Sequence, residues 1–395
     1  MRKRLSPLGY ILLALGTASL GLGLLELTKT SAPYPMDRVQ LDAAQRMARA
    51  EARLAEILEA RGIAVEEGLD INRTGLIGPE WTPLTTTVGN LEAKRSILNP
   101  NFAALMVRLY REAGLEAGDR VAIGASGSFP GLIIASLCAA DALGLKTTTI
   151  ASFGASMYGG TRPEFSSPEM IAILEKEGLV KRSLAAVSPG ANDDHGESPL
   201  FGDSRELIAS LARGIGVEFI DFDPPDLGAS IRRRLEIYRD YGDGNPACFV
   251  NIGGASANFG TLSASNDVPQ GLAPRLQRIP DSPERGLMFE FAARGLPVIN
   301  LLNVRALAQE YGLPWDPVPL PRPGEGGVYF KIARSRPMAI AFLILSLGIL
   351  IAGARARTRR PGAGQPRVHP GGLTAANGPG RVPDTSPSVP KEDLS

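Results

Sequence analysis

The sequence predicts an α/β fold: a Rossmann-like, three-layer domain with a parallel sheet, placed between two transmembrane helices. Short apolar runs alternate with helical patterns from about residue 63 to 325, which is the order of elements in a parallel sheet with helices on both faces. The strand-like runs are mostly apolar and are not period-two patterns, as expected of strands that are buried on both sides. Two uncharged apolar stretches flank this region, at residues 8–25 and 338–354.

Both flanking stretches are long enough to cross a bilayer as helices, which takes roughly 17–25 residues. Basic residues precede the first stretch and follow the second: Arg2, Lys3, Arg4, Arg355, Arg357, Arg359 and Arg360. Since basic flanks stay in the cytoplasm, we predict a protein of the cell (inner) membrane with residues 1–7 and 355–395 cytoplasmic. The alternatives are a cleaved signal peptide for the first stretch and a buried core helix for the second. The Gly- and Pro-rich tail is expected to be disordered.

The region between the stretches is expected to be extracytoplasmic. Residues 36–61 carry an apolar stripe at helical spacing and predict an amphipathic helix, which either packs onto the domain or forms a stalk or subunit contact. Residues 63–330 then form the α/β domain. Its strands are expected at residues 120–123, 147–151, 184–187, 217–222, 247–252 and 297–301.

The composition excludes several classes of protein. Of the 395 residues, 44% are hydrophobic and 21% are charged, so the chain is neither wholly disordered nor a transporter with many spans. The net charge is +1, and the region between the tails carries 32 basic and 37 acidic residues, which does not predict a nucleic-acid binder. Two Cys and two His are too few for a disulfide scaffold or a multi-histidine metal site. We predict no metal site and no cofactor.

Two loops rich in Gly and Ser follow predicted strands, at residues 123–131 and 252–260. Ligands of open α/β sheets bind beyond the carboxyl ends of the strands, and glycines let a ligand approach backbone N–H groups. A helix that starts near residue 130 would also point its positive end at this crevice. The loops therefore either bind a carboxylate or phosphate or merely form tight turns. Their candidate ligand-binding residues are Gly124, Gly127, Gly253, Gly254, Ser256 and Asn258.

Other polar residues near the carboxyl ends of the predicted strands are candidates for catalysis or anion binding. Ser126 or Ser128 would be a nucleophile if His195, the one histidine of the middle region, approached as a general base. The alternative for His195 is an ordinary residue of a solvated polar loop. Lys94 and Arg95 either meet an anionic ligand across the crevice or lie on a solvated segment that leads into a helix.

Four segments resemble the poly-gamma-glutamate system protein family. They are residues 70–78 (Asp-Ile-Asn-Arg-Thr-Gly-Leu-Ile-Gly), 85–87 (Thr-Thr-Thr), 90–95 (Asn-Leu-Glu-Ala-Lys-Arg) and the loop 124–131. The plan of one N-terminal span, an α/β domain and a second span is also similar, so that the resemblance covers most of residues 1–355. It implies action with a membrane poly-gamma-glutamate ligase and its small membrane partners in making or exporting the polymer. No catalytic residue is carried over from the family.

Three functions are compatible with these features. The favoured one is a non-catalytic accessory or binding subunit of a poly-gamma-glutamate synthesis and export system, with the lipid bilayer, the synthesis proteins and an anionic small molecule or polymer as partners. The second is an extracytoplasmic serine hydrolase or transferase that acts on gamma-glutamyl bonds. The third is an anchored solute-binding module for a small acid. No nucleic-acid partner is expected.

Overall fold

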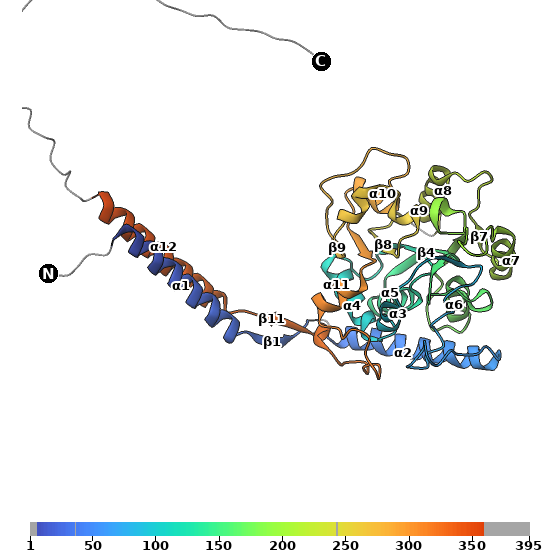
Figure 1. Cartoon of the computed structure of the whole chain (residues 1–395), viewed down its shortest axis with the longest axis horizontal. Helices are drawn as coiled ribbons and strands as arrows, with labels where there is room; N and C mark the ends of the chain where they lie inside the picture. The colour runs from blue at the N-terminus through green and yellow to red at the C-terminus, as the bar shows by residue number, and fades with distance from the viewer. Residues whose placement is uncertain (1–5, 36, 242–243, 359–395) are drawn as a thin grey trace, which may run out of the picture. The chain divides into compact units, whose positions relative to one another are not determined.

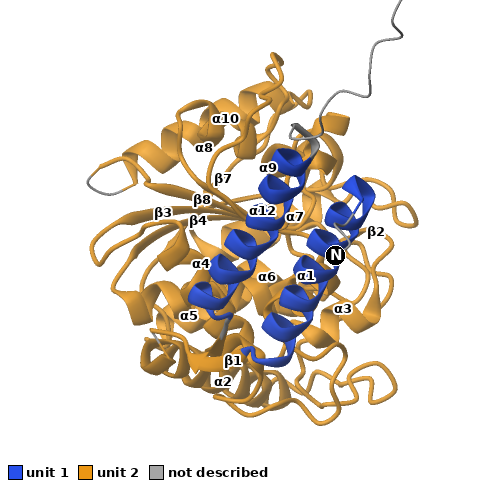
Figure 2. Ribbon diagram, turned by 90° about the vertical axis from the view of Figure 1, so that its left-hand side faces the viewer, with its two compact units in different colours: residues 1–29, 334–395 blue, residues 30–333 orange. Residues whose placement is uncertain are grey.

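The protein is described here from a computed structural model, in residues 6–35, 37–241 and 244–358. It divides into two compact units, residues 1–29 together with 334–395, and residues 30–333 (Figure 2). Most of the two predicted cytoplasmic tails, residues 1–5 and 359–395, lies outside the described residues.

The first unit is a pair of apolar helices, α1 (Pro7–Leu27) and α12 (Arg336–Thr358), which lie side by side (Figure 1). Both are long and apolar enough to cross a membrane. Glycines permit their close contact: a Cβ atom on Gly21 would lie 2.5 Å from Cγ of Phe342, and one on Gly353 would lie 2.8 Å from Cβ of Tyr10. Small residues allow such an approach between helices in lipid. Helix α12 also continues beyond residue 355, where we expected the tail to begin.

The second unit is a mixed α/β domain built on a seven-stranded sheet in the order β7-β6-β4-β3-β8-β10-β9. The strands are β3 (Arg120–Ala125), β4 (Lys146–Ser152), β6 (Leu184–Ser188), β7 (Glu218–Phe219), β8 (Cys248–Ile252), β9 (Gly271–Ala273) and β10 (Val298–Leu301). Neighbouring strands are parallel except β9, which pairs antiparallel with β10 at the edge. The predicted parallel-dominated sheet is confirmed with all six expected strands, whereas β9 was not predicted.

Helices cover both faces of this sheet (Figure 2). Val121 and Ile123 of β3 point into one apolar cluster, and Ala122 between them points into the other, because successive side chains of a strand face opposite sides. The first cluster includes α2 (Asp37–Ala60), α4 (Asn101–Glu112), α5 (Pro130–Leu143), α6 (Ser167–Lys176), α7 (Arg205–Ile215) and α11 (Val304–Tyr311). The second includes α8 (Leu227–Asp240) and α10 (Leu287–Ala293). Cys138 and Cys248 are free and buried, as apolar residues of these clusters.

Helix α2 is an integral part of the domain. Its residues Ala43, Met47, Ala50 and Leu54 are fully buried, and the helix packs against α4 and α5. Gln40 on the same face donates hydrogen bonds from its Nε2 atom to two backbone carbonyls. This packing differs from the stalk-like interpretation, because the apolar stripe covers the outer side of α4 and α5.

Short elements complete the domain. Strand β2 (Thr85–Thr87) pairs in parallel with β5 (Ala155–Ser156), and β1 (Thr30–Pro33) pairs antiparallel with β11 (Phe330–Ala333). Two short helices, α3 (Leu91–Ser96) and α9 (Ser256–Phe259), lie close to the ends of the sheet strands. The pair β2 and β5 brings two distant segments together, and β5 contacts the loop after β3, because the Ser156 N–H donates to Oγ of Ser128.

Candidate functional site

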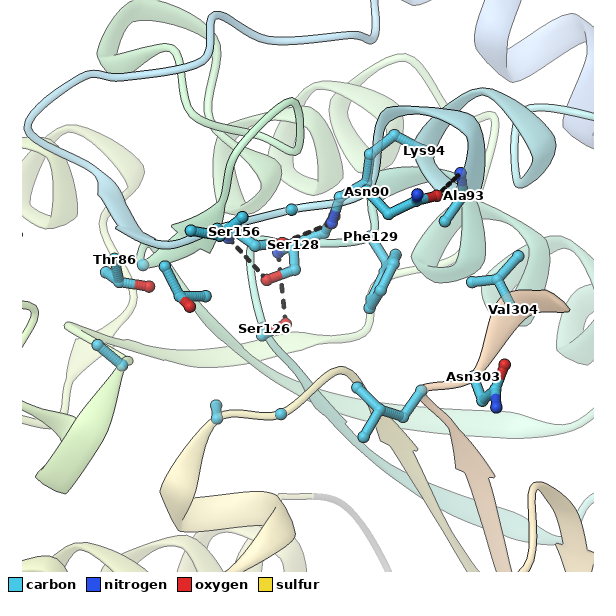
Figure 3. Close-up of a pocket in the computed structure, with 18 of the residues that line it drawn as sticks. Thr86, Asn90, Ala93, Lys94, Ser126, Ser128, Phe129, Ser156, Asn303 and Val304 are labelled. Carbon is cyan, nitrogen blue, oxygen red and sulfur yellow. Dashed lines mark hydrogen bonds between the residues drawn. The ribbon is translucent and has the colours of Figure 1, made fainter. Parts of the chain in front are cut away.

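A cavity of about 790 Å³ lies where the strand order of the sheet reverses. Strands β3 and β8 are neighbours there, but the chain continues from β3 toward β4 and from β8 toward β10, on opposite sides. Open α/β sheets bind ligands beyond the carboxyl ends of their strands at such a point. The cavity is lined by the loops after β3 and β8, and by residues of β2, β5, α3 and α11 (Figure 3).

Lys94 of α3 forms part of the cavity wall, although only 2% of its surface is exposed. The N-cap Asn90 begins this helix by accepting a hydrogen bond from the Ala93 N–H at 2.7 Å, a regular way of starting a helix. The Lys94 Nζ atom donates to the carbonyl oxygen of Ser128 at 2.5 Å and to Oγ of Ser156 at 2.6 Å. It also lies 3.8 Å from the centre of the Phe129 ring.

Both hydrogen-bond acceptors of this ammonium group are neutral. Burial penalises the charged form of an amine, and it lowers the pKa of Lys94 from 10.5 to about 7. The alternative that Lys94 lies on a solvated segment is therefore wrong. The side chain is held inside the domain, where near neutral pH it exists in both protonation states.

Three serines form a chain of contacts next to Lys94. The Ser128 N–H donates to Oγ of Ser126 at 3.3 Å, and the Ser156 N–H donates to Oγ of Ser128 at 2.9 Å (Figure 3). Ser126 and Ser128 come from the loop after β3, whereas Ser156 comes from β5. All three line the cavity and are nearly buried. Of these three hydroxyls, it is that of Ser156 that contacts the amine.

The charges of the cavity wall have one sign. Its lining residues, all of them among those described, include Lys94 and Arg305 but no Asp or Glu. The Arg305 guanidinium lies 4.6 Å from the ring centre of Trp315, which also lines the cavity. Hydroxyl and amide groups of Thr86, Asn192 and other residues supply the remaining polar surface. Such a wall suits an anionic or carbonyl-bearing ligand.

Of the four glycines that we predicted to bind a ligand, Gly254 lines the cavity and the other three do not. A Cβ atom on Gly254 would have no atom closer than 3.8 Å. Gly253 has a φ angle of +87° and leaves room for Ser126, whose Oγ atom would clash with a Cβ atom at that position. Gly124 and Gly127 allow close packing inside the domain, Gly124 against Oδ1 of Asn258. Gly253 therefore supports the site through the serine that it accommodates.

The second half of the loop after β8 lies away from the cavity lining. Ser256 and Asn258 are buried in α9, and the Ser256 N–H donates to the carbonyl oxygen of Ala191. Oδ1 of Asn258 is buried without a hydrogen-bond partner among the described residues. These two predicted ligand-binding residues pack beneath the site.

The structure does not form the Ser–His pair of our hypothesis. His195 is half-buried, is not among the residues that line the cavity, and its Nδ1 atom has no hydrogen-bond partner in the described part of the chain. The neighbouring Asp194 points elsewhere: it forms a buried ion pair with Arg234 at 2.7 Å and accepts hydrogen bonds from Ser188 and Ser230. Asp194 therefore stabilises the packing of its loop on α8 and does not orient His195.

Arg95 has an internal partner. Its guanidinium forms two hydrogen bonds to the Asp316 carboxylate, at 2.7 and 2.5 Å, and both side chains are mostly buried. This bidentate pair ties α3 to the segment that carries Trp315, so Arg95 positions the cavity wall and is not itself part of the lining.

Ser156 and Arg305 are site residues that the sequence analysis missed. Ser156 lies in a segment with Gly and Ser, residues 152–160, that follows a predicted strand, which is the same signal that singled out the other two loops. Arg305 lies at the start of α11, directly after a predicted strand, and no local pattern distinguishes it from a solvated arginine.

Comparison with protein-family models, curated proteins and solved structures gave no match.

Proposed function

We propose that this protein is a membrane-anchored subunit of a poly-gamma-glutamate synthesis or export system, and that its extracytoplasmic, Rossmann-like domain binds a segment of the anionic polymer. The observation that carries the proposal is the cavity at the reversal point of the sheet, whose charged lining residues are Lys94 and Arg305. A polymer of γ-linked glutamate presents a carboxylate and an amide carbonyl at each repeat. The cavity offers the Arg305 guanidinium for the first and hydroxyl or amide donors for the second.

The segments that resemble the poly-gamma-glutamate system family support this choice. Residues from 85–87, from 90–95 and from the loop 124–131 all contribute to the wall of one cavity. The fourth segment, 70–78, forms a turn nearby in sequence, in which the Asp70 carboxylate accepts hydrogen bonds from the N–H groups of Thr74 and Gly75. Most of the resemblance thus falls on residues that surround a ligand site.

The membrane placement rests on the pair α1 and α12 and on the basic residues beyond their outer ends. Both helices pass the length and apolarity needed for a span, and the positive-inside rule places the two termini in the cytoplasm. The Rossmann-like assignment rests on the parallel strands and on the reversal of strand order between β3 and β8.

Ligand binding is tested with the full-length protein in detergent micelles and a γ-linked glutamate oligomer of defined length. Trp315 lines the cavity, so its fluorescence reports binding once the other tryptophan is removed by Trp81→Phe. We expect Arg305→Gln to weaken binding about tenfold, the value of one charge-assisted hydrogen bond. The matched control is Arg294→Gln, an arginine that also lies over an aromatic ring but outside the cavity. Equal affinity of the two variants, or no binding, contradicts the proposed ligand.

Topology is tested by cysteine labelling in intact cells. The two native cysteines are buried, so a Leu200→Cys variant, at a position 63% exposed, provides a single reactive thiol. A membrane-impermeant maleimide should label this variant without permeabilisation. Labelling that requires permeabilised cells contradicts the extracytoplasmic placement.

A further inference from the structure

The contact between Lys94 and Ser156 has the geometry of a base and a nucleophile. Their Nζ and Oγ atoms are 2.6 Å apart, and both residues line the cavity. We propose that Ser156 and Lys94 form a serine–lysine catalytic pair that cleaves or transfers the amide-linked acyl group of a chain bound in this cavity. The inference rests on the proposed function for its substrate, a γ-linked polyamide, and replaces His195 as the base of our serine-hydrolase alternative.

Lys94 is suited to act as a base because its side chain is buried and its hydrogen-bond acceptors are neutral. These acceptors are a carbonyl and a hydroxyl. The Nζ atom also lies over the Phe129 ring, 3.8 Å from its centre, a contact that favours the ammonium form only weakly compared with a carboxylate partner. The nearest residue in sequence that could neutralise it, Glu92, is two positions away in α3 and does not line the cavity. A desolvated lysine without a carboxylate partner loses its proton readily, and its free lone pair can accept the proton of an adjacent hydroxyl.

Ser156 is the nucleophile that the backbone positions for this role. Strand β5 pairs with β2 on one side, and the Ser156 N–H is held by Oγ of Ser128. The hydroxyls of Ser126 and Ser128 both accept hydrogen bonds from backbone N–H groups, whereas the amine donates to the Ser128 carbonyl and the Ser156 hydroxyl. Ser126 and Ser128 therefore position the pair, whereas the reacting oxygen belongs to Ser156.

The chemical steps are those of acyl transfer. Oγ of Ser156 bonds to the carbonyl carbon of the scissile amide, and the hydroxyl proton passes to the neutral Nζ of Lys94. The C–N bond then breaks, Lys94 returns the proton to the departing amine, and the acyl group remains as an ester on Ser156. Water or an amine of another chain attacks this ester, its proton passes to Nζ, and the C–Oγ bond breaks as Lys94 reprotonates Ser156. The cycle consumes no oxidant, reductant or metal.

The pair is tested with a fluorophosphonate probe, which forms a covalent bond with activated serines, on the full-length protein in micelles. We expect a single adduct, located at Ser156 by peptide mass spectrometry. Ser156→Ala should abolish it, and Lys94→Met should slow it at least a hundredfold, the usual contribution of a general base. Arg294→Gln, at an arginine outside the cavity, should retain the full rate. An adduct at another residue, or an equal rate in Lys94→Met, overturns the pair.

A second variant separates chemistry from folding. Ser156→Cys should be alkylated by iodoacetamide at that position, and adding Lys94→Met should shift the pH midpoint of alkylation, because a neighbouring ammonium stabilises a thiolate. An unchanged midpoint overturns the pair even if Ser156→Ala fails to fold. Oligomer binding is measured in parallel by Trp315 fluorescence. Binding without any serine adduct refutes the catalytic pair alone, whereas an adduct at Ser156 without binding refutes the proposed ligand alone.

Discussion

Burial of Lys94 makes the stability of the domain depend on pH in a way that one substitution removes. The pKa of Lys94 is about 7 in the folded protein and near 10.5 when the side chain is exposed. Between these values the unfolded chain binds a proton that the folded chain does not, so the free energy of unfolding rises with pH. Below about pH 7 both states bind the proton, and the full burial penalty remains.

The size of the effect follows from the shift. Each pH unit inside this window contributes about 1.4 kcal/mol, so wild type should gain about 3 kcal/mol between pH 7.5 and 9.5 relative to Lys94→Met. Methionine has a similar length and no charge, and therefore contributes no such slope. The two hydrogen bonds that the variant loses cost about 0.5–1.5 kcal/mol each, but this cost does not depend on pH and leaves the slope unchanged.

The measurement is urea unfolding of the α/β domain in the full-length protein, in detergent micelles, at several pH values. The quantity of interest is the difference in unfolding free energy between wild type and Lys94→Met, because titration of other groups cancels in it. We expect this difference to change by about 3 kcal/mol in favour of wild type from pH 7.5 to 9.5. A difference that stays constant within about 1 kcal/mol refutes the argument that Lys94 is desolvated and lacks a charged partner.

Three further predictions concern residues around the cavity. Gly253→Ala should destabilise the domain by about 1–3 kcal/mol in urea unfolding, because φ is +87° and the new Cβ atom would clash with Oγ of Ser126. An unchanged free energy of unfolding would contradict this loop geometry. Asp316→Asn should cost about 1.5–3 kcal/mol by weakening the bidentate pair with Arg95, and an unchanged unfolding midpoint contradicts that pairing. His195→Gln should leave the rate of fluorophosphonate labelling unchanged, since His195 does not line the cavity, and a large loss would restore the Ser–His hypothesis.

The strands of the sheet could be predicted because their signal is local. A run such as residues 184–187 is continuously apolar and is followed by Ser, Pro and Gly, which suffices to indicate a strand buried on both faces. The short edge strand β9, Gly271–Ala273, lacked this signal because three residues at an edge carry little apolar pattern. The order of the strands depends on pairings across more than a hundred residues, such as β3 with β8, and no local pattern encodes them.

Some residues of the candidate site could likewise be predicted from a local pattern, and others could not. The loop after β3 and Gly254 were recognisable from Gly and Ser after a strand, whereas Lys94 seemed as much a solvated residue as a ligand. Its burial results from the approach of Ser156, which lies 62 positions away in the chain, and of Phe129. His195 shows the converse, since a place near the carboxyl ends of the predicted strands did not bring its side chain to the serines.

The amino-acid sequence by itself determined the class of the domain and the two apolar helices, because strand burial and hydrophobic length are properties of consecutive residues. Tertiary structure alone decided which polar groups meet in the cavity and which protonation state Lys94 favours. A pKa depends on the solvent and charges within a few ångströms, and those neighbours come from β5 and from the loop after β3.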